Sequence, residues 1–270
     1  MTDIVVLIPH YNDITGLSKS LHSISISEPV DVLIVDDGSK IKPNQNELKH
    51  RHKNIHDIIV IYSSPNKGQA VVQNIGLKYI LESNKYKYIA RLDTGDACYP
   101  ERFVVQKKFL LNNSEIFLVG SQGLIVDTKG NKLFTSNLPL HHHEIKKRMH
   151  INSCFIHSSV MFKIESIKEV GYYPENYFAN DDYSFWFKFI KCFATANVDN
   201  CLVMYELNLN SISRGKYRKE LRARFRILLN YFSFKYFFYS IIGLSKVFIA
   251  YLLGVNIATN IAIFIKRLNL

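Results

Sequence analysis

Short apolar runs that alternate with helical patterns constrain this chain more than any other feature. Four runs rich in valine and isoleucine have the length and composition of buried strands, and they lie at residues 4–8, 32–35, 58–62 and 86–92. Between them, apolar residues recur at helical spacing, as at Leu17, Leu21 and Ile24. This alternation predicts an α/β fold with a mostly parallel sheet and helices on both faces, which binds ligands beyond the carboxyl ends of its strands.

The second half of the chain is less regular. We expect a helix after Pro100, a mobile polar loop at 136–150, and a helix that begins at Asp181 and Asp182. Further strands are expected at 117–126, 157–162 and 197–205. The three histidines at 141–143 favour a solvated loop over a metal site, because adjacent loop residues rarely converge on one ion.

Two of the predicted strands end in paired carboxylates. Asp36 and Asp37 follow the second run, where they either accept hydrogen bonds from a base or ribose or form an ordinary turn. Asp93 and Asp96 follow the fourth run, and their oxygens suit Mg²⁺ or Mn²⁺. Gly95 permits a tight bend and a close approach of backbone to ligand, although a turn is again the alternative.

Two predicted helix starts carry further candidates. Lys67 and Gly68 open the helix after the third run, where a positive charge and free N–H groups suit a diphosphate, or where an ordinary helix begins. Asp181 and Asp182 are either simple helix caps or a general base toward a hydroxyl. His157 either completes a metal site or is a hydrogen-bonded structural histidine.

Six motifs follow one another along residues 4–213: IPHYND, IVDDGS, NKGQAVVQNIG, ARLDTGDACYPERF, HSSVMF and NDDYSFWFKFI. Their order and spacing resemble family 2 glycosyltransferases, most of all bacterial enzymes that build lipopolysaccharide, O-antigen or capsule chains. The resemblance implies a Rossmann-like GT-A fold, a nucleotide-sugar donor, a glycan or glycolipid acceptor, Mn²⁺ or Mg²⁺ as cofactor, and inversion at the anomeric carbon. UDP-sugars are the commonest donors in families of this kind.

The resemblance also implies site residues. Those expected to bind the nucleotide sugar are Pro9, Tyr11, Asp36, Asp37, Lys67, Gly68, Arg91, Asp93, Thr94 and Gly95. Those expected to bind the metal are Asp93, Asp96 and His157. Asp181 and Asp182 match the family's Glu-Asp pair, whose second member is the expected base. The family's usual third-position aspartate is Gly95 here, so Asp96 or Asp93 must replace it as a metal ligand.

The charge distribution separates a C-terminal segment from the rest. The net charge is +11, and residues 214–226 carry seven lysines or arginines, followed by residues 236–265 with a single charge, Lys246. We therefore expect a catalytic domain at 1–213 and a basic, then apolar, helical segment at 214–270. Basic residues beside an apolar segment indicate peripheral attachment to the inner face of a bacterial membrane. A membrane span and packing on the domain are the alternatives, and a helix break is expected near Gly254.

Three other functions compete with a glycosyltransferase. A nucleic-acid binder would use the basic tract, but its apolar neighbour suits a membrane better, so no nucleic acid is expected. A nucleotidyltransferase would also use carboxylates and a metal. A catalytically inactive binding module is suggested by Gly95.

The four cysteines form no C-x-x-C pair, and the N-terminus lacks the basic and apolar pattern of a signal peptide, so we expect reduced thiols and a cytoplasmic location.

Overall fold

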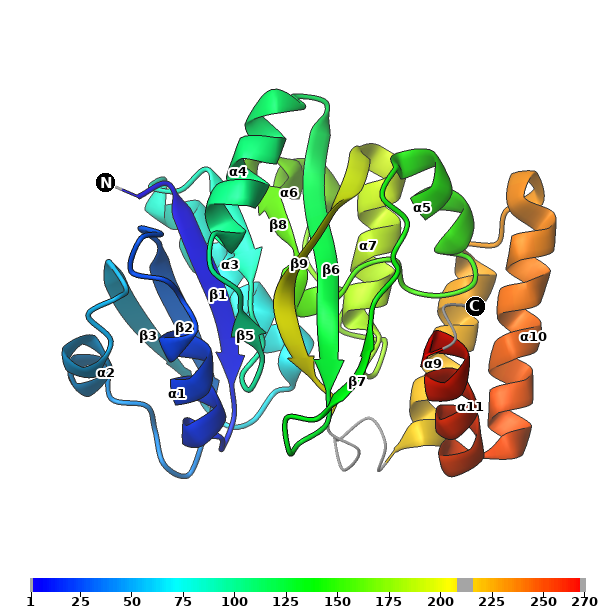
Figure 1. The fold of residues 1–270 in the computed structure, drawn as a ribbon, viewed down its shortest axis with the longest axis horizontal. Helices are drawn as coiled ribbons and strands as arrows, with labels where there is room; N and C mark the ends of the chain where they lie inside the picture. The colour runs from blue at the N-terminus through cyan, green and yellow to red at the C-terminus, as the bar shows by residue number, and fades with distance from the viewer. Residues whose placement is uncertain (1, 208–215, 268–270) are drawn as a thin grey trace.

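A single mixed sheet forms the centre of the computed structural model, which describes residues 2–207 and 216–267 (Figure 1). The strand order is β3-β2-β1-β4-β8-β6-β9-β5, with β7 paired to β6. The four predicted apolar runs form its parallel part: β1 (Ile4–His10), β2 (Asp31–Asp37), β3 (Asp57–Ser63) and β4 (Tyr88–Arg91). Their polar C-terminal residues therefore lie at one edge of the sheet, as the sequence predicts.

The remaining strands extend the sheet on the side of β4. They are β5 (Ala97–Cys98), β6 (Ile116–Val126), β7 (Lys132–Thr135), β8 (Met161–Lys163) and β9 (Ala194–Glu206). β8 runs antiparallel to β4 and β6, and β9 runs parallel to β6. β5 pairs antiparallel with β9, which brings the chain just after Asp93 next to the end of β9.

Helices cover both faces of the sheet. They are α1 (Ile14–His22), α2 (Gln45–Arg51), α3 (Gln69–Ser83), α4 (Arg102–Asn112), α5 (His142–Arg148), α6 (Ile167–Val170) and α7 (Asp181–Cys192). In β1, Val5 and Leu7 join one hydrophobic cluster, whereas Val6 and Ile8 join the other. Because successive side chains of a strand point to opposite faces, this alternation buries both sides of β1.

Two expectations for the segment between β7 and α7 are wrong. Residues 136–150 are not one irregular loop, because α5 forms within them and buries Ile145 and Met149 in the core. The strand expected at 157–162 is only β8, preceded by the 3₁₀ turn η1 (His157–Ser159). That turn aims the His157 and Ser158 side chains at residues beyond the end of β4 instead of into a strand ladder.

The C-terminal segment folds into helices that pack against the rest of the chain. The segment begins with α9 (Tyr217–Asn230) and the short turn η3 (Phe234–Tyr236). The helices α10 (Phe237–Leu253) and α11 (Val255–Arg267) follow. The predicted break is confirmed at Gly254, whose φ of 76° separates α10 from α11. The expected boundary at 213/214 and the first basic residue, Arg214, lie outside the described residues.

The inner side of these helices belongs to the same core as the sheet. Leu221 and Ile227 of α9 and Val247 of α10 join the cluster that contains Trp186 of α7. α10 approaches so closely that a Cβ placed on Gly243 would lie 1.9 Å from the carbonyl oxygen of His150. The inner side of the C-terminal helices is therefore packed on the domain, which was one of the arrangements expected beside membrane attachment and a membrane span.

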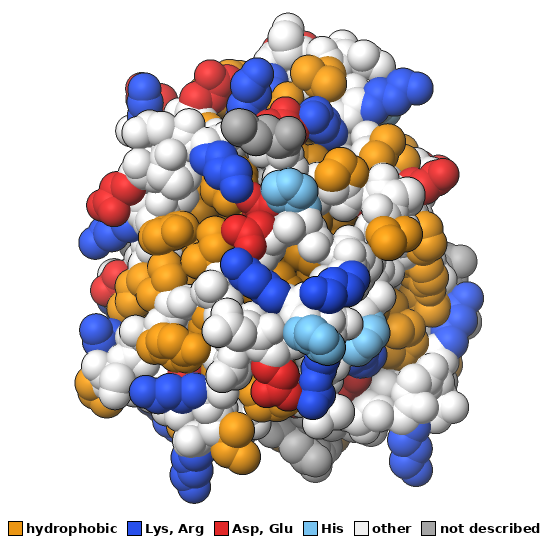
Figure 2. Space-filling view, turned by 90° about the vertical axis from the view of Figure 1, so that its left-hand side faces the viewer, with side chains coloured by type: hydrophobic (Ala, Val, Ile, Leu, Met, Phe, Trp, Pro, Cys, Tyr) orange, Lys and Arg blue, Asp and Glu red, His pale blue; other side chains and the backbone are white. Residues whose placement is uncertain are grey.

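The outer side of α10 and α11 is apolar and exposed. Phe238, Leu252 and Phe264 are 78%, 68% and 63% exposed. Among the described residues, the helical stretch Phe234–Leu253 is long and apolar enough to cross a bilayer, with a mean hydropathy of 1.6. The opposite end of the molecule, with α2 and β3, differs, because there lysine and arginine side chains are dispersed among acidic and apolar ones (Figure 2).

Candidate functional site

The paired carboxylates at the end of β2 are engaged by their own surroundings. Asp36 is fully buried, and it accepts hydrogen bonds from His10 Nδ1 at 2.8 Å and from the Ser39 amide at 3.1 Å. Asp37 accepts from the amides of Lys67 and Gly68 at 2.8 and 2.9 Å. Both aspartates therefore hold the loops that frame the edge of the sheet.

The backbone N–H groups at the start of α3 are already hydrogen-bonded, although the exposed lysine and the open space expected there are present. The N–H groups of Lys67 and Gly68 point to Asp37, so they are not the free groups that the sequence suggested for a diphosphate. The Lys67 side chain is exposed. Gly68 has a φ of 91°, and a Cβ there would meet no atom within 4 Å, which leaves open space above the helix start.

Beside it, the ends of β1 and β4 are tied together. The Thr94 hydroxyl donates to the carbonyl of Pro9 at 2.8 Å, and Tyr11 projects into solvent with 45% of its surface exposed. Gly95 has a φ of 97° and open space where a Cβ would stand. A glycine in this left-handed conformation lets a ligand approach the backbone closely.

Asp93 is the centre of a polar network. Its Oδ1 accepts from Arg91 Nη2 at 2.8 Å, and its Oδ2 pairs with His157 Nδ1 at 3.0 Å. His157 Nε2 accepts from Arg91 Nε at 3.2 Å and lies 3.2 Å from the Tyr173 hydroxyl, so His157 carries its proton on Nδ1 and donates it to Asp93. Burial opposes ionisation, but His157 and Arg91 together lower the pKa of Asp93 to about 2.

Asp96 lies close in sequence but faces another way. Its carboxylate accepts from the Ser158 hydroxyl and from the Glu206 amide at 2.9 Å, and the residue is only 4% exposed. Burial, reinforced by the charge of Asp93, raises the pKa of Asp96 to about 7. Asp96 thus joins η1 to the end of β9, and it is not among the residues that line the neighbouring cavity.

Asp93 is the one carboxylate among the predicted metal ligands on this edge that also lines the neighbouring cavity. No three histidine, cysteine or carboxylate side chains within residues 2–207 and 216–267 form a ready metal site. Mg²⁺, however, is commonly held by one or two carboxylates together with substrate phosphates and waters. Each Asp93 oxygen keeps a second lone pair, so Asp93 fits such a site, with Arg91 and His157 fixing its orientation.

The predicted acidic pair opens α7. Asp181 is 6% exposed, and its Oδ2 accepts from Gln73 Nε2 of α3 at 3.1 Å. Asp182 is half-buried, and its Oδ1 accepts from the Tyr183 amide at 2.7 Å. Burial raises the pKa of both carboxyls, and the charge of Asp182 raises that of Asp181 further. Two carboxylates this close cannot both ionise cheaply, and the more buried Asp181 is the better holder of a shared proton.

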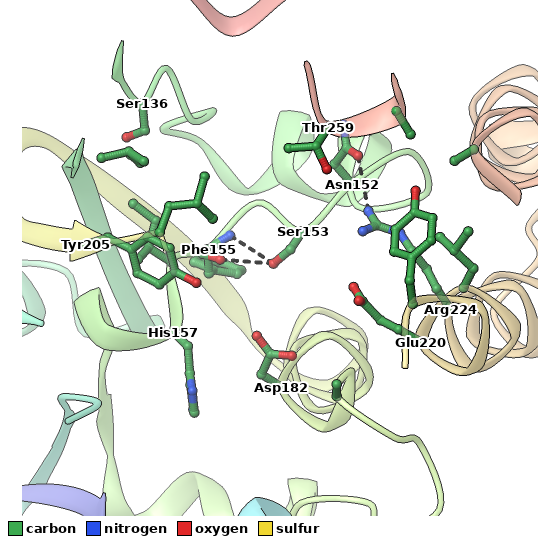
Figure 3. Close-up of a pocket in the computed structure, with 18 of the residues that line it drawn as sticks. Ser136, Asn152, Ser153, Phe155, His157, Asp182, Tyr205, Glu220, Arg224 and Thr259 are labelled. Carbon is green, nitrogen blue, oxygen red and sulfur yellow. Dashed lines mark hydrogen bonds between the residues drawn. The ribbon is translucent and has the colours of Figure 1, made fainter. Parts of the chain in front are cut away.

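One cavity of about 610 Å³ connects the sheet edge with the acidic pair (Figure 3). Asp93, His157, Asp181 and Asp182 all line it, so the structure brings together predicted residues that are up to 89 positions apart. In Figure 3, the Asp182 carboxylate points into the cavity between η1 on one side and α9 on the other. The volume falls within the usual range for small-molecule sites.

The far wall of the cavity contains residues that sequence reasoning missed. They are Asn152, Ser153, Tyr205, Glu220, Arg224, Lys246 and Thr259. Arg224 belongs to the basic tract, whose composition indicated a membrane surface but gave no sign that one arginine turns inward. Only the packing of α9, α10 and α11 against the domain brings these residues to the cavity.

Solved structures with a similar fold include glycosyltransferases. S. aureus TarS 1-349 in complex with UDP-GlcNAc has a TM-score of 0.62 at 16% identity, over 93% of this chain and 72% of that one. The mannosyltransferase PcManGT from Pyrobaculum calidifontis, in complex with GDP-Man and Mn²⁺, has a TM-score of 0.60 at 14% identity, over 96% and 78%. The expected GT-A fold is therefore confirmed.

Sequence relatives agree with this fold. The amylovoran biosynthesis glycosyltransferase AmsE of Erwinia amylovora is 24% identical over 217 residues, which cover 78% of this chain and 79% of the relative. The O-antigen biosynthesis glycosyltransferase WbnJ of Escherichia coli is 24% identical over 219 residues, covering 80% and 83%. A family model described as glycosyl transferase family 2 matches residues 5–171. Since that match covers more than half of the chain, this protein belongs to glycosyl transferase family 2.

Proposed function

We propose that this glycosyltransferase moves a hexose from a nucleotide sugar, with a UDP-sugar as donor, to a hydroxyl of a lipid-linked bacterial surface glycan. One observation carries the proposal: a single cavity joins Asp93, at the carboxyl edge of the sheet, to Asp182, at the start of α7. A donor at the edge and an acceptor in the cavity would meet there. The names of AmsE and WbnJ support a surface polysaccharide, and the TarS complex supports a UDP-sugar.

In the reaction that we propose, Asp182 is the general base. It accepts the proton of the acceptor hydroxyl, whose oxygen bonds to the anomeric carbon as the bond to the nucleoside diphosphate breaks. A single displacement of this kind inverts the anomeric configuration. The raised pKa of Asp182 makes it a stronger base than an exposed aspartate, which favours proton transfer near neutral pH.

The donor site that we propose lies along the ends of β1, β2 and β4 and at the start of α3. The residues assigned to it are Pro9, Tyr11, Asp36, Asp37, Lys67, Gly68, Arg91, Asp93, Thr94 and Gly95. Asp36 and Asp37 act by shaping the loops, because their oxygens are already engaged. Lys67 supplies an exposed positive charge for the diphosphate, and the space above Gly68 and Gly95 admits the donor.

For the cofactor, we propose Mn²⁺ or Mg²⁺ held by Asp93 together with the donor diphosphate. Such an ion offsets the negative charge that develops on the leaving group. His157 and Arg91 orient Asp93 from behind, which gives His157 a supporting part in the predicted metal set. Asp96 was also predicted as a ligand, but its oxygens face Ser158 and Glu206, so its part is to brace η1.

We further propose that the protein lies on the cytoplasmic face of the membrane through α10 and α11. Their exposed apolar side chains and the exposed arginines of α9, such as Arg218 and Arg222, suit an anionic lipid surface. Replacing Phe238, Phe248 and Leu252 together by serine should abolish sedimentation with anionic vesicles at low salt. Wild-type protein that ignores such vesicles would contradict membrane attachment.

The function itself is tested by a transfer screen. Purified protein is incubated with UDP- and GDP-sugars, Mn²⁺ and lipid-linked acceptors, and release of the nucleoside diphosphate is followed. We expect turnover with at least one UDP-sugar and its loss in Asp182→Asn. Release of pyrophosphate from a nucleoside triphosphate and a sugar phosphate would instead establish a nucleotidyltransferase.

A further inference from the structure

Two cations from different helices meet on the cavity wall. Arg224 of α9 donates from Nη2 to Oδ1 of Asn152 at 3.1 Å, and Lys246 of α10 donates from Nζ to the same oxygen at 2.9 Å. These distances keep the two nitrogens within 6.0 Å of each other. Two cations that converge on one oxygen of the cavity wall are placed so that an anion with several acceptor oxygens could bridge them.

The cation pair is near the proposed base. Arg224, Lys246 and Asp182 line the same cavity, and Figure 3 places Arg224 across the opening from Asp182. The Arg224 guanidinium lies 5.0 Å from the centre of the Tyr183 ring, next to Asp182 in sequence. In the part of the chain that the structure describes, no carboxylate lies within ion-pair distance of Arg224. An anion bound here would therefore sit close to the acceptor hydroxyl.

Beyond the cations, the cavity becomes apolar. Val247 and Ala250 of α10 and Ala258 and Ile263 of α11 line it, and the outer surface of the same two helices is apolar and exposed. From Asp182 outward the site thus presents two carboxylates, those of Asp182 and Glu220, then the two cations and then an apolar surface. This order matches a molecule with a sugar hydroxyl, a phosphate and a hydrocarbon chain in sequence.

We propose that Arg224 and Lys246 form a subsite for the phosphate or diphosphate that links the acceptor sugar to a lipid. The proposal rests on the proposed function and specifies its acceptor. Because the base and the cations line one cavity of about 610 Å³, the accepting sugar is close to the phosphate. The reaction that supplies this acceptor must therefore attach a sugar to a lipid phosphate, and this enzyme extends the glycan near its lipid end.

Binding of farnesyl diphosphate, measured by calorimetry in the presence of EDTA and saturating UDP, tests the subsite directly. We expect at least a tenfold weaker affinity in Lys246→Gln and Arg224→Gln, the loss typical of one charge-assisted hydrogen bond. Arg224→Lys should retain most of the affinity. Arg226→Gln, which removes a charge from the same helix away from the cavity, should retain all of it.

Four results would overturn the proposal. Equal losses in Arg226→Gln and Lys246→Gln would mean general surface attraction. Unchanged affinity in Lys246→Gln, an exposed residue whose replacement should preserve the fold, would exclude the cation pair. Inorganic pyrophosphate binding as tightly as farnesyl diphosphate would exclude a lipid as the source of the phosphate, and equal binding of farnesol would exclude the phosphate itself.

A transfer assay separates this proposal from the proposed function. Acceptors that carry the same sugar on farnesyl diphosphate or on a neutral alkyl chain are compared, and wild-type preference for the charged acceptor should disappear in Lys246→Gln. If neither acceptor is extended from any donor, yet farnesyl diphosphate binding still depends on both cations, the proposed function fails and the phosphate subsite stands.

Discussion

Replacing Asp182 by asparagine is the sharpest test of the proposed chemistry. Asparagine keeps the size and the Oδ1 that accepts from the Tyr183 amide, but it cannot take a proton. Loss of a general base lowers turnover by about a hundredfold or more, which corresponds to about 2.7 kcal/mol in the activation barrier. Donor affinity should be unchanged, because the expected donor contacts lie at the ends of β1, β2 and β4 and at the start of α3.

Two other carboxylates near the cavity serve as matched controls. Asp181→Asn should retain most of the activity, because Asp181 is the more buried member of the pair and asparagine resembles its protonated form. Glu220→Gln removes a carboxylate from the same cavity on α9 and should also remain active. Turnover under saturating donor and acceptor, together with UDP affinity by calorimetry, compares all three variants.

The pH dependence adds an independent measurement. The base must be ionised, and burial raises the pKa of Asp182, so wild-type turnover should rise with pH through that raised pKa. Asp181→Asn keeps a neutral group beside Asp182, so the acidic limb should stay where it is in the wild type. An inactive Asp181→Asn enzyme beside an active Asp182→Asn enzyme would refute this assignment.

Three further predictions concern the frame of the site. Asp93→Asn should abolish Mn²⁺-dependent UDP binding in calorimetry while Asp96→Asn retains it, and the reverse result would make Asp96 the ligand. The pKa of Asp96 is about 7 in the folded state against an ordinary value of 3.8, so its contribution to stability is present at low pH and is lost as the pH rises to 7. Asp96→Asn should therefore raise the free energy of unfolding by up to about 4 kcal/mol at pH 8, seen as a higher melting temperature, and should not raise it at pH 4. Gly243→Ala should lower the free energy of unfolding by about 1–3 kcal/mol because its methyl group meets the His150 carbonyl, whereas Ser245→Ala on the exposed side of α10 should not.

Local chemistry determined the first half of the molecule. The valine- and isoleucine-rich runs fit only strands covered on both faces, and Asp37 and Asp93 follow such runs directly, so their position at the carboxyl edge could be predicted. The start of α7 at Asp181 could be predicted for the same reason, since acidic residues favour helix N-termini. Gly254 likewise marked the end of α10.

The sequence could not predict the directions in which the carboxylates at the end of β4 point. Asp93 and Asp96 are three residues apart and equivalent in composition, yet one faces the cavity and the other is held by Ser158 and Glu206. The partner amide of Glu206 is 110 residues away, and it arrives only because β9 pairs with β5. α5 was missed for a related reason, because Ile145 gains its stabilisation from distant core residues that its polar sequence neighbours do not reveal.

The cavity wall depended most on tertiary structure. The sequence alone determined that residues after 214 are basic and then apolar, and this composition indicates a surface for anionic lipid. It could not determine that Arg224 of α9 and Lys246 of α10 meet at one oxygen of Asn152. Helical periodicity specifies which residues share a face, but the neighbour of that face is decided by packing between segments far apart in the chain.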